Sequence, residues 1–230
     1  MPYRRLPNTD LARIRALKTA VQKSAGEEFR QSLIDNKTLS DAETLLLLFE
    51  RKCKQYRQYY EIQVKAGKQL QQKAKNARIY LSHFIQVLYM CVMRSEIKSE
   101  QLALYGLENH NLIVPELTSN ELLLSWGKKV LQGEELRTAK GGVPIFNPSL
   151  AKVKVIFSVF EEEYAKQIVR HQNTLRALKE VEALREDVDR VICYIWNQVE
   201  KYNEKNALED RLRKNKEYGI IYYYRKGEKS

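Results

Sequence analysis

The stretch GEELRTAKGGVPIFNPS, from Gly133 to Ser149, combines residue types that can hold an anion. Backbone N–H groups of a glycine-rich loop, together with the N-terminus of the helix that follows it, can bind phosphate, and nearby cations strengthen the attraction. The stretch has adjacent glycines, two basic residues and an Asn-Pro pair near its end. One interpretation is therefore a ligand-binding or enzymatic loop whose contact residues are Arg137, Lys140, Gly141, Gly142 and Asn147.

A structural turn explains the same residues more fully. Neither GxxxxGK[ST] nor GxGxxG occurs in the stretch, and no strand is expected before the glycines. Gly141 or Gly142 can end the preceding helix with a positive φ. Asn147 before Pro148 predicts a helix start, because asparagine caps the first N–H groups and proline fits the first helical position. We therefore favour a turn between two helices.

No other stretch carries a recognisable catalytic or metal-binding motif. The histidines, His83, His110 and His171, occur without an HExxH or ExxH pattern. His83 and His171 lie on or beside apolar helix faces, where a lone histidine is usually a core residue. Cys53 lies in the basic run 51–54, which can lower the pKa of its thiol, but one reactive cysteine does not make a catalyst. We therefore expect a protein that is not an enzyme and that needs no metal or cofactor.

Positive charge is concentrated on one helical segment. The formal net charge is +11, and residues 51–78 hold nine lysines and arginines against one acid, Glu61. On a helix, five of those cations share the face opposite an apolar stripe, and together they are named the basic ridge: Lys54, Arg57, Lys65, Lys68 and Lys75. A ridge of this kind attracts phosphates. Lysine-rich helix faces also serve as solubilising surfaces.

The C-terminal extension, residues 207–230, interleaves basic and aromatic residues. Arg225 and Lys226 follow a run of tyrosines, a pattern that suits base stacking combined with phosphate contact. The ridge and the extension together favour a nucleic-acid-associated protein as the alternative function, although no recognised nucleic-acid-binding module is visible. The extension also predicts a strand over Ile220–Tyr224, whose rings pack on the helices or on MPYRRL near the start of the chain.

Helical periodicity dominates the rest of the chain. Apolar residues recur at steps of three and four through Ser149–Asn206, which contains no Gly or Pro. A second long helix is expected from Asp41 to about Ser95, with Ser40 and Glu43 as a capping box, and Tyr59 and Ile62 belong to its apolar stripe. Shorter helices are predicted from after Asn8-Thr9-Asp10 to about Asp35 with a break near Gly26, from after Thr118-Ser119-Asn120 to about Arg137, and over Leu208–Lys216.

The sequence therefore predicts an all-α fold. We expect an elongated helical bundle with two very long antiparallel helices, two shorter helices and a short C-terminal helix/strand extension. One of the short helices should pack along each half of the long pair. A single domain over residues 1–230 is expected, with Trp126 and Trp196 at core positions.

Cysteine usage and hydropathy indicate the compartment. Cys53, Cys91 and Cys193 lie far apart and form no CxxC pair, which favours a reducing environment. The N-terminal residues lack the apolar core of a secretory signal. The most apolar window, Ile79–Met93, is shorter than the ~20 residues of a membrane span. We expect a cytoplasmic protein with no membrane partner.

Long amphipathic helices suit association with another copy or another protein. A stretch of the long pair that neither short helix covers would need a partner to bury its apolar side chains. The sequence therefore favours a non-enzymatic helical scaffold or protein-interaction protein.

Five stretches together carry a family resemblance: Pro2–Leu17, Tyr80–Met90, Trp126–Ser149, Ile195–Glu200 and Tyr218–Arg225. Through them most of the chain resembles a family of uncharacterised bacterial all-helical proteins of about this length. That family carries no assigned activity, so the resemblance transfers no functional residue. It implies a bacterial, cytoplasmic, helical protein.

Overall fold

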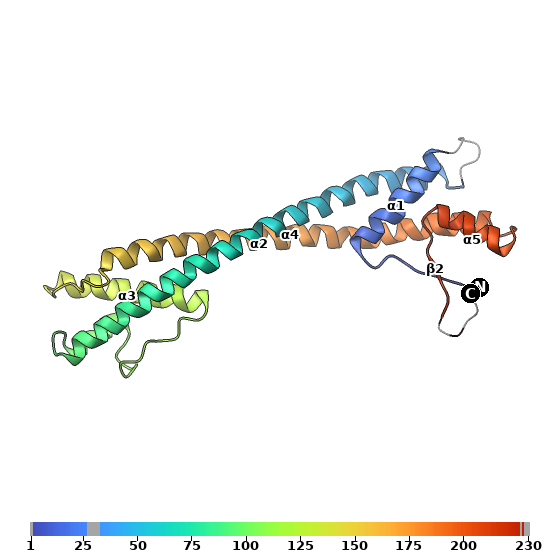
Figure 1. Cartoon of the computed structure of the whole chain (residues 1–230). Helices are drawn as coiled ribbons and strands as arrows, with labels where there is room; N and C mark the ends of the chain where they lie inside the picture. Colours follow the sequence, from blue (N-terminus) through green and yellow to red (C-terminus); the bar gives the residue numbers. More distant parts are fainter. Residues whose placement is uncertain (1, 27–32, 226, 228–230) are drawn as a thin grey trace. The chain divides into compact units, whose positions relative to one another are not determined.

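The computed structural model describes residues 2–26, 33–225 and 227, and its regular structure is almost entirely helical (Figure 1). The elements along the chain are β1 (Tyr3–Arg4), α1 (Asp10–Ala25), α2 (Asn36–Met93), the 3-10 helix η1 (Ser99–Tyr105), α3 (Asn120–Ala139), α4 (Leu150–Tyr202), α5 (Leu208–Glu217) and β2 (Tyr222–Tyr223). The predicted all-α class with two long helices is confirmed. Among the described residues, no helix has the length and apolar character that crossing a bilayer requires.

The chain divides into two compact units. The terminal unit comprises Met1–Tyr60 with Asn173–Ser230, and the central unit comprises Glu61–Gln172. Both α2 and α4 contribute a segment to each unit, and within each unit those segments run antiparallel. In the terminal unit, for example, Lys52 pairs with Glu180 while Asp35, earlier in the chain, bonds to Gln198, later in the chain. The single domain expected from the sequence stays a prediction.

The core of the central unit lies between α2, η1, α3 and α4. Leu81, Phe84 and Leu88 of α2 are fully buried, at the three- and four-residue steps that keep side chains on one helix face. Phe157 and Phe160 of α4 pack in the same cluster. The apolar periodicity therefore identifies the buried faces of both helices in this unit.

The core of the terminal unit is built by α1, α2 and α4 with the chain end. Leu17, Phe49 and Trp196 are buried in one cluster. Strand β2 pairs antiparallel with β1, with Tyr223 opposite Tyr3 and their ring centroids 5.9 Å apart. The predicted strand at the chain end is confirmed, but it is shorter than Ile220–Tyr224.

Three of the predicted helix starts, including Leu208 of α5, are confirmed to within a residue, and two are wrong. Thr9 caps α1 and Ser119 caps α3, each accepting a backbone N–H three residues later. Helix α2, however, begins at Asn36 and not at Asp41. The Asp35 carboxylate accepts the Thr38 N–H at 2.9 Å and the Thr38 hydroxyl at 2.7 Å, which caps the helix earlier than Ser40 could.

The predicted start of the last long helix is also wrong. Helix α4 begins at Leu150, and Ser149 caps it, its hydroxyl accepting the Lys152 N–H at 3.4 Å. Phe146 and Ser149 bridge across Asn147-Pro148, whose peptide bond is cis. Asn147 therefore lies inside a tight turn and cannot cap the helix.

The first helix ends near the predicted break. Gly26 is the C-cap residue of α1, and its N–H bonds to the carbonyls of Lys23 and Ser24. The predicted continuation over residues 27–32 lies outside the described residues.

Candidate functional site

A buried polar network lies below the Gly133–Ser149 stretch in the central unit. The Tyr105 hydroxyl donates to Glu134 Oε2 at 2.5 Å. Arg137 donates from Nε to Glu134 Oε2 at 2.9 Å and from Nη2 to Oε1 at 2.8 Å. Tyr105 and Glu134 are fully buried and Arg137 is 2% exposed. A fork of this kind fixes both position and orientation of the two side chains.

The network fastens the loop that follows α3. Arg137 Nη2 also donates to the Val143 carbonyl at 2.7 Å, and the Ile145 N–H donates to Glu134 Oε1 at 3.2 Å. The Gly142 N–H bonds to the Arg137 carbonyl at 3.1 Å. Val143 and Ile145 are thus bonded to the side chains of one buried ion pair, and Gly142 to the backbone of Arg137. This arrangement gives the loop a defined conformation.

Charge and burial set the protonation of this network. Burial, reinforced by the Glu134 carboxylate, raises the pKa of Tyr105 well above its usual range. The hydrogen bonds to Glu134 raise the pKa of Arg137. Near neutral pH the Tyr105 phenol is therefore neutral and the Arg137 guanidinium is charged. Because neither group titrates there, the role of the network is to stabilise the loop after α3.

The fastened loop presents apolar side chains to solvent. Val143 is 75% exposed and Phe146 is 77% exposed. Phe146 belongs to the walls of two hollows of the central unit. The first is lined by Ile79, Tyr80, His83, Asn147, Pro148, Ser149 and Lys152, and the second by Val87, Cys91, Arg94, Glu96, Ile97, Val143, Pro144 and Ile145. This set, centred on Phe146, is named the Phe146 surface.

The structure does not bring the predicted ligand-loop residues to one place. Arg137 is buried and engaged with Glu134, whereas Lys140 and Gly141 are exposed. Gly141 has the predicted positive φ, at 87°, and Gly142 packs against Arg137. Asn147 lies in the first hollow, apart from the others. The ligand site at this loop stays a prediction, and the Arg137 guanidinium, 2% exposed, bonds to Glu134 and to the Val143 carbonyl.

The expectation of core histidines is wrong for His83 and His171, since both are exposed. Leu81, Phe84 and Leu88 occupy the buried positions around His83, which leaves the imidazole on the rim of the first hollow. His171 Nδ1 lies 3.2 Å from Gln63 Nε2. Within the described residues, no group of three His, Cys, Asp or Glu side chains is placed to hold a metal ion.

The basic ridge is exposed in both units. Lys54 and Arg57 belong to the terminal unit, and the other three cations belong to the central unit. None of the five makes an ion pair or side-chain hydrogen bond within the described part of the chain. On α2 of the central unit, the face opposite Lys65, Lys68 and Lys75 is buried. The cations are thus free to meet an anionic partner.

Part of the predicted apolar stripe is wrong. Tyr59 is 36% exposed and Ile62 is 53% exposed, and neither belongs to a core cluster. In the central unit the facing side chains at this level are polar, because Gln167 Nε2 donates to the Gln63 carbonyl at 3.2 Å. Ile62 lies beside this polar contact and outside both core clusters.

The tyrosines of the C-terminal extension take part in packing. The Tyr222 hydroxyl donates to Glu200 Oε1 at 2.6 Å and accepts from Asn215 Nδ2 at 2.9 Å. The Arg225 guanidinium lies 4.2 Å from the centre of the Tyr3 ring. Lys226 lies outside the described residues. Strand pairing therefore accounts for part of the basic-aromatic pattern that suggested nucleic-acid contact.

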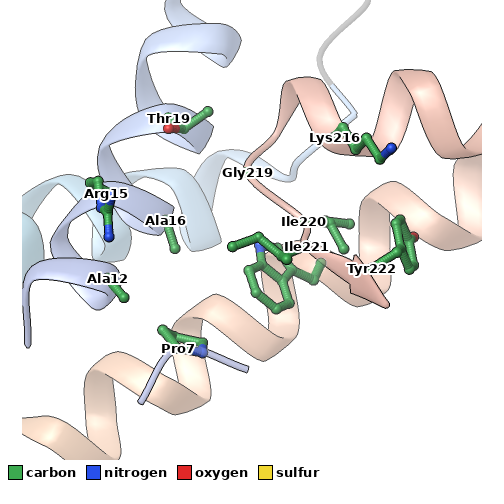
Figure 2. Close-up of a pocket in the computed structure, with 11 residues that line it drawn as sticks. Pro7, Ala12, Arg15, Ala16, Thr19, Lys216, Gly219, Ile220, Ile221 and Tyr222 are labelled. Carbon is green, nitrogen blue, oxygen red and sulfur yellow. The ribbon is translucent and has the colours of Figure 1, made fainter. Parts of the chain in front are cut away.

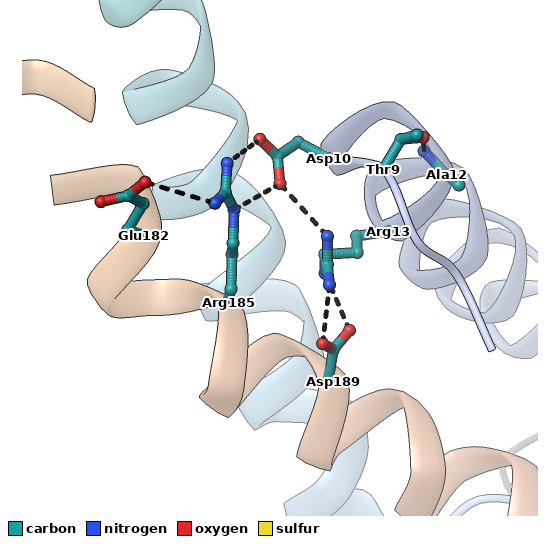
Figure 3. Close-up of polar contacts among 7 residues, drawn as sticks. All are labelled: Thr9, Asp10, Ala12, Arg13, Glu182, Arg185 and Asp189. Atoms are coloured by element: carbon teal, nitrogen blue, oxygen red, sulfur yellow. Dashed lines mark hydrogen bonds and ion pairs between the residues drawn. The ribbon is translucent and has the colours of Figure 1, made fainter. Parts of the chain in front are cut away.

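Ion pairs fasten α1 to α4 in the terminal unit (Figure 3). Arg13 donates from Nε and Nη2 to the two Asp189 carboxylate oxygens at 2.8 and 2.9 Å. Arg185 donates in the same way to the Asp10 carboxylate, at 2.9 Å for each bond. Arg13 Nη1 also reaches Asp10 at 3.3 Å, so the four side chains form one chain of alternating charge. These groups are half-buried, unlike the network around Glu134.

The basic run 51–54 does not lower the pKa of the Cys53 thiol. Burial raises the pKa of the Cys53 thiol to about 11, and the charge of Asp10 acts in the same direction. Arg185 and Arg57 lower it, but desolvation is the larger effect. Cys53 is therefore a poor nucleophile near neutral pH.

Comparisons with known proteins identify no relative. No family model, no curated protein and no solved structure matches the chain. The resemblance to a bacterial helical family stays a prediction.

Proposed function

We propose that this chain is a non-enzymatic helical interaction protein that associates through the Phe146 surface, with a second copy of itself as the partner. The observation that carries the proposal is the exposure of Phe146 and Val143 on a loop whose backbone is tied to a buried ion pair. A preorganised loop loses little conformational entropy on binding. Exposed aromatic side chains beside hollows are typical centres of binding energy.

A symmetric pair of copies suits the arrangement of this surface. In a two-fold interface the same patch lies on both sides, so Phe146 of one copy can enter a hollow beside Phe146 of the other. The second hollow is lined largely by apolar side chains such as Val87 and Ile97, whereas the first combines Ile79 with polar side chains such as His83 and Lys152.

The test compares two matched variants by sedimentation velocity over a concentration series. Phe146→Ala should shift the native protein towards the 27.1 kDa monomer, and Leu136→Ala, which removes another exposed apolar side chain of the same unit, should not. A strict monomer at every concentration would contradict self-association. A photo-crosslinking residue at position 146, compared with one at 136, then tests contact between copies directly.

A second candidate function is association with nucleic acid through the basic ridge. The observation that favours it is the exposure of all five ridge cations, none of them held by an acid within the described residues. Several phosphates neutralised at once would give affinity that falls steeply with salt. Self-association through apolar contacts should persist at high salt, so the two functions separate in one salt series.

Fluorescence anisotropy with labelled single- and double-stranded oligonucleotides tests this candidate. Changing Lys65, Lys68 and Lys75 together to Gln should reduce the slope of log affinity against log salt by about 2–3. The matched control changes Lys128, Lys154 and Lys166 to Gln, three exposed cations of the same unit that pair with glutamates. Equal losses in both triples would show that only net charge matters.

A further inference from the structure

The terminal unit contains an apolar pocket that the proposed function does not use (Figure 2). Its volume is about 450 Å³, within the range of small-molecule sites. Its walls come from the segment before α1, from α1, α4, α5 and the chain after α5. The lining residues are Pro7, Ala12, Arg15, Ala16, Thr19, Trp196, Lys216, Gly219, Ile220, Ile221 and Tyr222.

Small side chains and one glycine shape this pocket. Ala12 and Ala16 face it from α1, so their short side chains leave its space open. Gly219 has a φ of +82°, which residues with a side chain rarely adopt, and a Cβ there would lie 3.3 Å from Thr19 Cβ. The chain therefore turns sharply after α5 and brings Ile220 and Ile221 to the pocket wall.

The polar side chains of the pocket are mostly donors. Arg15 and Lys216 are exposed, and within the described residues neither side chain makes an ion pair or a hydrogen bond. Arg13, two residues from Arg15, is held by Asp189. Trp196 is 1% exposed, and its Nε1–H has no acceptor among the described residues. No lining residue is acidic.

We propose that this pocket binds a small amphiphile with an apolar body and a single carboxylate. The apolar walls formed by Pro7, Ile220 and Ile221 remove the body of such a ligand from water. Arg15 and Lys216 supply the positive charge for its carboxylate, since neither is neutralised by the protein. The positive charges of Arg15 and Lys216 repel the head group of a cationic amphiphile of the same length and so disfavour its binding in this pocket.

Titration calorimetry with octanoate tests the proposal on the full chain, with octylamine as the probe of equal length and opposite charge. Octanoate should bind with a Kd on the order of 100 µM, and octylamine at least ~10-fold more weakly. In a Trp126→Phe background, Trp196 is the remaining tryptophan, so a saturable fluorescence change places the ligand at this pocket.

Matched variants separate the pocket cations from general charge. Arg15→Gln with Lys216→Gln should weaken octanoate about tenfold. Lys18→Gln with Lys214→Gln removes two exposed cations of the same helices that do not line the pocket, and should leave the Kd unchanged. Ala12→Leu, which fills the pocket from a half-buried position, should abolish binding while the circular dichroism spectrum stays native. Absence of octanoate binding, equal binding of octylamine, or equal losses in both double variants would overturn the proposal.

Discussion

The two units hold a peripheral segment in different ways. In the central unit, the loop after α3 is tied to Glu134 and Arg137, which are 0% and 2% exposed. In the terminal unit, α1 is tied to α4 by Arg13 and Asp189, whose side chains are 13% and 39% exposed. The chemistry is the same, an arginine–carboxylate fork, but the surroundings differ.

Burial changes the consequence of losing one partner of an ion pair. Water and salt can replace a lost partner at the half-buried pairs of α1, so removing one charge there costs little. Below the loop, no solvent reaches the remaining charge, and removing one partner leaves the other uncompensated. The half-buried ion pairs of α1 therefore tolerate the loss of one partner, whereas the buried Glu134–Arg137 pair does not.

The largest expected effect comes from breaking the buried pair. Arg137→Met or Glu134→Leu should each lower the free energy of unfolding by about 3–5 kcal/mol, because each leaves one buried charge unpaired. Urea-induced unfolding followed by circular dichroism measures this loss.

Two controls sharpen that measurement. The double variant Glu134→Leu with Arg137→Met should be less destabilised than either single variant, since no charge remains in the core. Glu135→Gln, next in sequence but 48% exposed and paired with Lys154, should change stability by less than ~1 kcal/mol. Equal losses of stability in Glu134→Leu and Glu135→Gln would contradict the distinction between buried and exposed ion pairs.

A smaller effect is expected where α3 approaches η1. A Cβ at Gly133 would lie 2.7 Å from the Leu104 carbonyl oxygen, so Gly133→Ala should cost about 2 kcal/mol by forcing the backbones apart. At Gly67 of α2 the nearest atom is Gln167 Nε2 at 3.5 Å, so Gly67→Ala should stabilise by about 0.5–1 kcal/mol. Thermal unfolding of both variants checks the signs, and a gain at Gly133 would contradict the close packing.

The attachment of α1 should respond to salt. Arg13→Gln should cost about 1 kcal/mol at low salt, because it breaks half-buried ion pairs to Asp189 and Asp10. Since salt screens such pairs, this cost should shrink between about 50 mM and about 500 mM salt. The cost of Arg137→Met should stay the same over this range of salt, because the Glu134–Arg137 pair is buried. Urea titrations at both salt concentrations measure the stability cost of each variant. Equal salt dependence of the two costs would contradict the difference in solvent exposure between the two ion pairs.

The smallest effect concerns Cys53 and pH. Its thiol has a pKa raised to about 11 in the folded chain from an ordinary value of 9.0, so the unfolded chain deprotonates first. The stabilising contribution is therefore complete below about pH 9 and is lost as pH rises to about 11. Iodoacetamide labelling read by mass spectrometry should modify Cys53 much more slowly than a small thiol at pH ~8. Labelling as fast as that of the small thiol would contradict the shift.

Local sequence predicted the elements of this protein well. The starts of α1 and α3 follow short polar runs that contain their caps, Thr9 and Ser119, and such a cap depends on residues only three apart. The strand at the chain end was visible from its run of tyrosines. Asp35 was missed as the cap of α2 because Ser40, followed by Glu43, matched the familiar capping-box spacing.

The candidate sites depended on contacts between distant residues. Glu134 and Arg137 are three apart on one helix, a spacing that sequence can reveal, but nothing local shows that Tyr105 completes their network. The exposure of Phe146 was likewise invisible, because a phenylalanine beside prolines is usually taken as packing. Arg137 was placed with the ligand candidates since its charge was visible and its burial was not.

Local patterns in the sequence are enough to predict the helical class, the two long helices, the basic ridge and most helix starts, because periodicity, charge order and capping are local properties. Tertiary structure decided which charged side chains form ion pairs and which remain available to a ligand. Arg13 and Arg15 are two residues apart on one helix, yet one is held by Asp189 and the other lines a pocket. Their difference arises from what α4 and the chain end place beside each of them.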